Sequence, residues 1–216
     1  MCLLSIPVML QTCPVCSSTS KVSDMSSMFC DCSGLTSLDL SHLDTRNVTN
    51  MSSMFSGCSG LTALDLSPLN TSKVSNMSSM FSRCSGLTSL DLASMDTGKV
   101  TNMSSMFRGC SSLTNLDFSL LDTQKVTDMG YMFCDCSSLT ALNLTYMNTQ
   151  KVTEMVWIFK DCSKLINLSL GEKFAFVGSN YYLSEGTWYA SDGTTYTSNE
   201  KSCTIPNNKA DTYTRR

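Results

Sequence analysis

The side chains best suited to chemistry in this sequence are acidic residues that recur at one position of an internal repeat. Asp39, Asp65, Asp91 and Asp117 follow one another at intervals of 26 residues, and Asn143 continues the row. If the repeats stack, these side chains lie about 4.8 Å apart, the spacing of neighbouring strands. Repulsion at that distance raises carboxyl pKa values and attracts a cation or a basic partner. We therefore predict a ligand-binding surface. The alternative is that each Asp bonds a neighbouring Ser or Thr and keeps this edge soluble.

Two further rows accompany the acidic one. Small residues precede it by two positions, and Ser37, Ser89 and Asn115 from this row complete the predicted binding surface. A basic row on another edge consists of Lys73, Lys99, Lys125 and Lys151. Exposed charges of this kind contribute little to stability and usually form a solvated face. Attraction of anionic glycans is the alternative reading of the lysines.

Cysteine is abundant, with twelve residues, but its spacing indicates packing more than chemistry. Six share one repeat position: Cys32, Cys58, Cys84, Cys110, Cys136 and Cys162. We expect them to stack as small apolar side chains in the core. Cys13, Cys16 and Cys30 stand outside this row, and with Cys32 they leave three readings open: unpaired thiols, a disulfide or a zinc knuckle. The C-x-C spacing of Cys30 and Cys32 is a poor second half of a zinc site, so no metal is predicted.

Residues for catalysis are hard to find. His42 is the only histidine, and its repeat position is variable, with Pro68 and Ser94 in the following copies. The sequence contains no Ser-His-Asp arrangement, no H-E-x-x-H and no phosphate-binding glycine loop. We expect a non-enzymatic protein without a cofactor.

The bulk composition excludes several classes of partner. The net charge of −3 and the pI near 5.0 argue against nucleic acid, which requires a concentrated basic surface. No apolar run reaches the length of about 18 residues that a membrane-spanning helix needs.

A hydrophobic content of 42% is sufficient for a core. The chain is therefore expected to fold into one elongated body with atypical ends.

The elements that position these rows are two apolar motifs in each repeat. One is Leu61-x-x-Leu64-x-Leu66, typical of the strand of a leucine-rich repeat. The other is Met51-x-x-Met54-Phe55, whose spacing puts three side chains on one face of a helical turn, with Asn50 as its N-cap. A fixed period of this length is the signature of a solenoid. The predicted fold class is an α/β repeat of about six turns, each with a short parallel strand and a short helical turn.

Four segments follow from where the repeat begins and ends. Residues 1–21 are a degenerate or truncated N-terminal segment, 22–171 the solenoid, 172–200 a C-terminal β cap and 201–216 a polar tail or linker. Within the cap, Asp192-Gly193 predicts a hairpin turn. Its aromatic residues Trp188, Tyr189 and Tyr196 are expected to cover the open end of the core. The alternative for these three is carbohydrate or cell-wall binding.

The repeat V-T-x-M-S-x-M-F-x-x-C-S-x-L-T-x-L-D-L-S-x-x-D-T-S-K, which covers Val22 to Leu170, resembles the BspA-like leucine-rich repeat surface proteins of bacteria, mycoplasmas and protozoa. The resemblance implies a right-handed, leucine-rich-repeat-like solenoid and an adhesive protein that is secreted or on the cell surface. Its implied partners are host or neighbouring-cell surface or matrix proteins. It supplies no catalytic residues. Met1 to Leu10 lacks the basic residues of a signal peptide, a departure from the family pattern. A structural spacer within a larger surface protein is the alternative function.

Overall fold

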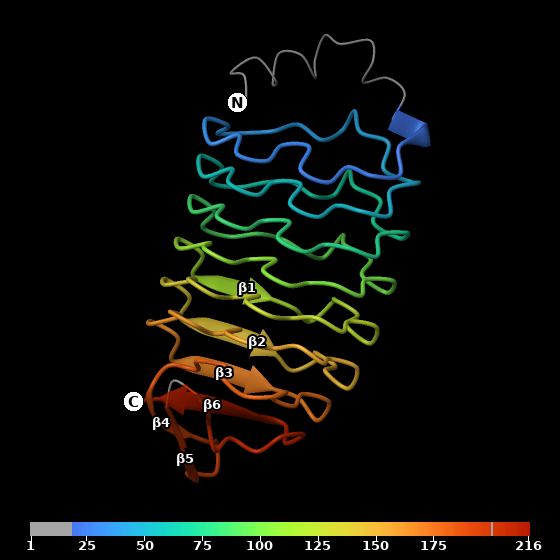
Figure 1. The fold of residues 1–216 in the computed structure, drawn as a ribbon. Coiled ribbons are helices and arrows are strands. Elements are labelled where there is room, and N and C mark those ends of the chain that lie inside the picture. The colour runs from blue at the N-terminus through green and yellow to red at the C-terminus, as the bar shows by residue number, and fades with distance from the viewer. Residues whose placement is uncertain (1–18, 200) are drawn as a thin grey trace.

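The computed structural model describes residues 19–199 and 201–216. The chain winds through successive coils that stack along one axis, and the C-terminal strands lie at one end of the stack (Figure 1). Parallel strands β1 (Asn115–Asp117), β2 (Ala141–Leu144) and β3 (Asn167–Leu170) come from three consecutive coils. The last segment, β6 (Asp211–Arg215), pairs antiparallel with β3. Strands β4 (Gly186–Tyr189) and β5 (Thr195–Ser198) form an antiparallel pair, and the sheet order is β1-β2-β3-β6-β4-β5.

The predicted α/β class is wrong, because the described residues form strands, turns and a short 3-10 turn at 19–21, and no α-helix. Where a helical turn was predicted, Ser53 and Gly57 have positive φ values of 56° and 76°. The Ser53 and Phe55 N–H groups donate to carbonyls of the next coil, at 2.8 and 2.9 Å, whereas Met54 donates within its own turn. An α-helix would need those N–H groups for its own carbonyls. The inward side chains are nevertheless fully buried, since two tight turns also place them on one side.

Strands are also fewer than predicted. The L-x-x-L-x-L segments of the first three coils are extended without strand pairing, and only the last three contain β1–β3. Gly60 and Gly86 lie in the early coils, where an added Cβ would come within 2.6 Å and 2.5 Å of a carbonyl oxygen of the preceding coil. The strand-bearing coils have Ser112 and Ser138 at this position. The early coils therefore approach one another more closely here than a side chain would permit.

Residues 211–215 belong to the segment for which a polar tail or linker is predicted. In the structure they are β6, which lies between β3 and β4 and buries Tyr213 completely. An exposed edge of β3 would leave a row of unpaired N–H and C=O groups. Strand β6 pairs with β3 and provides partners for these N–H and C=O groups.

The core consists of identical side chains stacked from coil to coil. Six Phe rings, from Phe29 to Phe159, lie nearly parallel with centroids 5.6–6.2 Å apart. Beside them the Cys58 thiol donates to the Phe29 carbonyl at 3.1 Å, and the same bond recurs at each later cysteine of the row. Burial raises the pKa of Cys58 to about 11 and that of Cys84 to about 12. Cys32, the first residue of the row, is disulfide-bonded.

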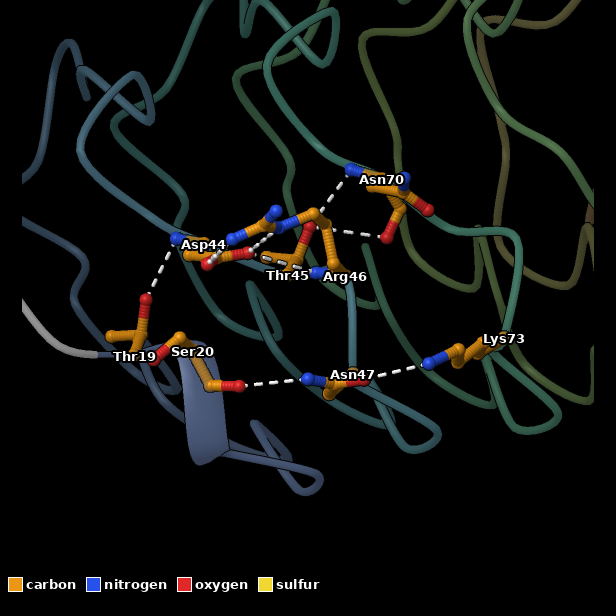
Figure 2. Close-up of polar contacts among 8 residues, drawn as sticks. All are labelled: Thr19, Ser20, Asp44, Thr45, Arg46, Asn47, Asn70 and Lys73. Atoms are coloured by element: carbon orange, nitrogen blue, oxygen red, sulfur yellow. Dashed lines mark hydrogen bonds and ion pairs between the residues drawn. The ribbon is translucent and has the colours of Figure 1, made fainter.

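A row of buried threonines joins the coils on another edge. The Thr45 hydroxyl accepts from the Asn70 N–H at 2.7 Å and donates to the Asn70 carbonyl at 3.0 Å (Figure 2). Thr123 makes the same pair of bonds with Asn148, at 2.8 and 3.0 Å. These hydroxyls replace direct backbone pairing between successive coils. Among the described residues, no helix is long and apolar enough to span a membrane.

Replacing Thr123 by Val should lower the free energy of unfolding by about 2–4 kcal/mol, because the Asn148 N–H and C=O groups lose their buried partner. Urea denaturation measures this change. Thr114→Val is the control, since Thr114 is exposed and surface substitutions usually stay within about 0.5 kcal/mol. Equal midpoints for the two variants would contradict the structural role of the threonine row.

The five buried free thiols of the stacked cysteine row, Cys58, Cys84, Cys110, Cys136 and Cys162, should resist alkylation by iodoacetamide at pH 8 until the protein is denatured. The thiolate is the reactive form, and burial raises the pKa of each thiol in this set. Peptide mass spectrometry measures the labelling, with the partly exposed Cys30 as internal control. Labelling of the five as fast as Cys30 would contradict the packing.

Candidate functional site

The predicted binding residues form an exposed face along the stack. All eight are solvent-exposed: Ser37, Asp39, Asp65, Ser89, Asp91, Asn115, Asp117 and Asn143. In the strands the alternation is regular, so Leu116 and Leu142 point into the core while Asp117 and Asn143 point outward. Asp117 is directly opposite Asn143 in the parallel register. The repeat therefore aligns these side chains on one surface.

The structure gathers three of the eight at one place. Asn115, Asp117 and Asn143 line an open depression over β1–β3, together with Asn167 and Ser169. The other five, Ser37, Asp39, Asp65, Ser89 and Asp91, belong to earlier coils and do not line it. Strand β6 extends the polar face, because the Thr212 and Ser169 hydroxyls are 2.9 Å apart and the Thr214 hydroxyl donates to Asn167 Oδ1 at 3.1 Å.

Each acid of the row also closes a turn of its own chain. Oδ1 of Asp39 accepts the Ser41 N–H at 2.8 Å, and Oδ1 of Asp65 accepts the Ser67 N–H at 2.9 Å. These bonds lower the pKa of Asp39 and of Asp65. The predicted rise in carboxyl pKa is wrong for these two residues, because the backbone N–H groups stabilise the ionised form more than neighbouring carboxylates destabilise it. A second carboxylate oxygen of each residue is available to a ligand.

Two exposed apolar side chains follow closely after strands β1 and β2. Leu120 follows β1 and Tyr146 follows β2 at the same repeat position, and they are 69% and 66% exposed. Both line a shallow cavity that also includes Asp122 and Lys173. The polar face thus continues into an apolar pair, a combination found in protein interfaces.

The hairpin aromatics are poorly placed to bind a sugar. Trp188 is 0% exposed, and its indole N–H donates to Ser198 Oγ at 3.0 Å. Tyr189 and Tyr196 are partly exposed, but Arg216 lies 4.9 Å from the Tyr189 ring centroid and Lys209 lies 5.8 Å from that of Tyr196. Trp188 is therefore a core residue of the cap, and the alternative of carbohydrate binding does not fit it.

The basic row is exposed along its length. Lys73 donates to Asn47 Oδ1 at 2.6 Å, and Asn47 in turn donates to the Ser20 carbonyl at 2.8 Å (Figure 2). Within residues 19–199 and 201–216, no group of three or more His, Cys, Asp or Glu side chains is arranged to hold a metal ion. Cys13 and Cys16 lie outside the described residues, and Cys30 is a free, partly exposed thiol.

One group of exposed residues was missed by the sequence analysis. Tyr131, Trp157 and Tyr182 form consecutive ring contacts on the turn side of the last coils. The available signal for Tyr131 and Trp157 was their position, because Ser53 and Ser105 occupy the equivalent place in earlier coils. An aromatic residue that replaces a repeated serine at the surface is a departure from the repeat.

Asp65→Asn should keep the turn, because Asn143 closes the equivalent turn with its Oδ1 at 3.1 Å from the Thr145 nitrogen. Asp65→Ala removes the acceptor. We expect a lower urea midpoint for the Ala variant than for the Asn variant at pH 7. The difference between wild type and Asp65→Ala should be present above the unfolded-state pKa and disappear as the pH falls through the lowered folded-state pKa. Identical midpoints for both variants at pH 7 would contradict this role.

A family model covers most of the repeat region. It matches residues 16–91 and 85–176 and is described as "Mycoplasma protein of unknown function, DUF285". No curated protein and no solved structure matches the chain. Because the matched residues make up more than half of the sequence, this chain belongs to the family of Mycoplasma proteins of unknown function, DUF285.

Proposed function

We propose that this protein is a non-enzymatic binding module that engages a protein ligand through its strand face, as a BspA-like adhesin on the microbial surface. The observation that carries the proposal is the exposed face over β1–β3, where Asp117 and Asn143 lie opposite each other and where the exposed Leu120 and Tyr146 follow β1 and β2. The face repeats one chemistry over several coils, which suits an extended ligand better than a small substrate.

The charges indicate the kind of ligand. Asp39, Asp65, Asp91 and Asp117 are exposed, and no ion pair joins any of them to another residue of the described chain. One oxygen of each is held by its own turn, which fixes the direction of the other. Complementary charge increases association rates and specificity, so a partner surface rich in Lys and Arg is favoured. The exposed Leu120 and Tyr146 would supply apolar contacts at the end of that interface.

A structural spacer remains the second candidate. The stacked coils form an extended body (Figure 1), and the same architecture would separate two attached parts without any binding. The two functions differ in whether the strand face contacts a partner.

Surface plasmon resonance with immobilised fibronectin, laminin and collagen tests the proposal. We expect saturable binding to at least one of them, weakened by added salt because exposed charges are screened. Converting Asp39, Asp65, Asp91 and Asp117 together to Asn should weaken that binding by about tenfold, and the turns should persist because Asn accepts the same N–H. Lys99→Gln with Lys125→Gln is the control on the basic edge. Absence of binding to all three proteins, or unchanged affinity of the fourfold variant, would refute the strand-face proposal.

A further inference from the structure

A second exposed surface lies on the turn side of the last coils, away from the strands. Its centre is the aromatic row, which we define as Tyr131, Trp157 and Tyr182. The Tyr131 and Trp157 ring centroids are 5.2 Å apart and inclined by 62°, and those of Trp157 and Tyr182 are 5.8 Å apart and inclined by 65°. All three side chains are partly exposed. The row therefore presents a twisted series of aromatic surfaces to solvent.

The backbone under the row is unusual for such large residues. Tyr131, Trp157 and Tyr182 have φ values of 60°, 57° and 57°. Bulky side chains rarely occupy this left-handed region. The earlier coils carry serine at the repeat position of Tyr131 and Trp157, with Ser27, Ser53, Ser79 and Ser105 at φ values of 56–57°. Because the coils stack with serine at this position, the fold does not require an aromatic residue there. A bulky residue held in a strained backbone conformation is typical of functional sites.

Charged side chains beside the row neutralise one another. Arg108 lies 5.4 Å from the Tyr131 ring centroid and forms an ion pair of 3.6 Å with Asp135. Lys160 lies 5.3 Å from the Trp157 ring centroid and forms an ion pair of 2.5 Å with Asp161. Arg108 and Lys160 thus each have their own carboxylate. The charges in contact with the rings therefore cancel, which favours an uncharged ligand on the row.

Polar groups remain available around the rings. Tyr131 Oη, Trp157 Nε1 and Tyr182 Oη make no hydrogen bond to any residue that the structure describes. Next to Tyr182 is a cavity lined also by Asp161 and Glu185. The Glu185 side chain is exposed and has no ion-pair partner in the described chain. Apolar ring surfaces therefore lie beside free donors and acceptors.

Arg215 closes one side of this cavity. Its guanidinium donates to the Ser163 carbonyl at 2.7 Å and to the Glu185 carbonyl at 3.3 Å. These bonds join β6 to the coil that carries Asp161. The cavity wall is consequently held by the sheet and does not depend on a ligand for its shape.

We propose that the aromatic row and the adjoining cavity bind a neutral oligosaccharide. A sugar ring has an apolar face that stacks on an aromatic ring and hydroxyls that need both donors and acceptors, and Tyr and Trp supply an apolar body with a polar end. Few polar groups placed beside apolar walls are typical of small-ligand sites. The rings follow one another along an edge, which suits the successive rings of an extended saccharide. This site is separate from the strand face and does not depend on the function proposed there.

The two tryptophans make the binding measurable in the full chain. Trp157 is partly exposed and Trp188 is 0% exposed, so acrylamide quenching reports chiefly on Trp157. Cellohexaose, chitohexaose, maltohexaose and mannohexaose serve as probes, with isothermal titration calorimetry for affinity. We expect at least one to protect Trp157 from quenching in a saturable manner. Tyr131→Ser and Trp157→Ser, which restore the serine of the earlier coils, should each weaken its binding by about tenfold or more.

Tyr146→Ser is the matched control, because Tyr146 is 66% exposed on the strand side and its loss should leave saccharide affinity unchanged. Circular dichroism and thermal melting verify that the variants fold, and Tyr182→Ala provides a third variant on the row. The proposal is overturned if none of the four saccharides binds, if the row variants and Tyr146→Ser weaken binding equally, or if the row captures a protein and no saccharide. Loss of matrix-protein binding in the fourfold Asp variant would leave it intact.

Discussion

Hydrogen bonding between successive coils is the constraint on which this structure depends. Alternate N–H groups of the turn segment, such as those of Ser53 and Phe55, donate to carbonyls of the next coil and not to their own segment. On the opposite edge a threonine hydroxyl mediates the same connection. Buried backbone groups must find partners, and here most of those partners belong to a neighbour. A single coil would have no way to satisfy them and would not fold alone.

The same constraint explains the residue types that recur. The carbonyls of the stacked phenylalanines from Phe29 to Phe133 each receive a thiol from the following coil, so cysteine is both a small apolar side chain and a weak donor. Asx turns at Asp39 and Asp65 use short side chains to hold tight bends. At the end of the stack the pattern stops, and β6 covers β3 while Tyr213 and Trp188 fill the core. The coils of the repeat and the cap both provide partners for backbone groups, the coils through their neighbours and the cap through antiparallel strand pairing.

The sequence indicated the inward and outward rows well and the local backbone poorly. The Met51, Met54 and Phe55 spacing correctly identified a buried face, but a helical turn and a pair of tight turns bury the same three residues. Positive φ at Ser53 has no sequence signal, because serine is unusual there. A bond between each Asp and a neighbouring Ser or Thr was only the alternative to the predicted ligand-binding row, although such a turn lowers the pKa of Asp65. The bulk of Trp188 indicated a covering role at the end of the core, but its bond to Ser198, ten residues away across the hairpin, could not be read from the sequence.

The stacking bonds also have a consequence for how this chain can change in length. The threonine bonds link residues 25 or 26 apart and the thiol bonds link residues 29 apart, each at a constant interval, so interior coils present similar upper and lower surfaces to their neighbours. Removal or duplication of one complete period keeps the contacts between neighbouring coils equivalent to the original ones. Any other change of length shifts the residues of every later coil out of alignment. The number of coils is therefore a variable that recombination can alter in whole steps, and the reach of the molecule changes with it while the local chemistry of each face is preserved.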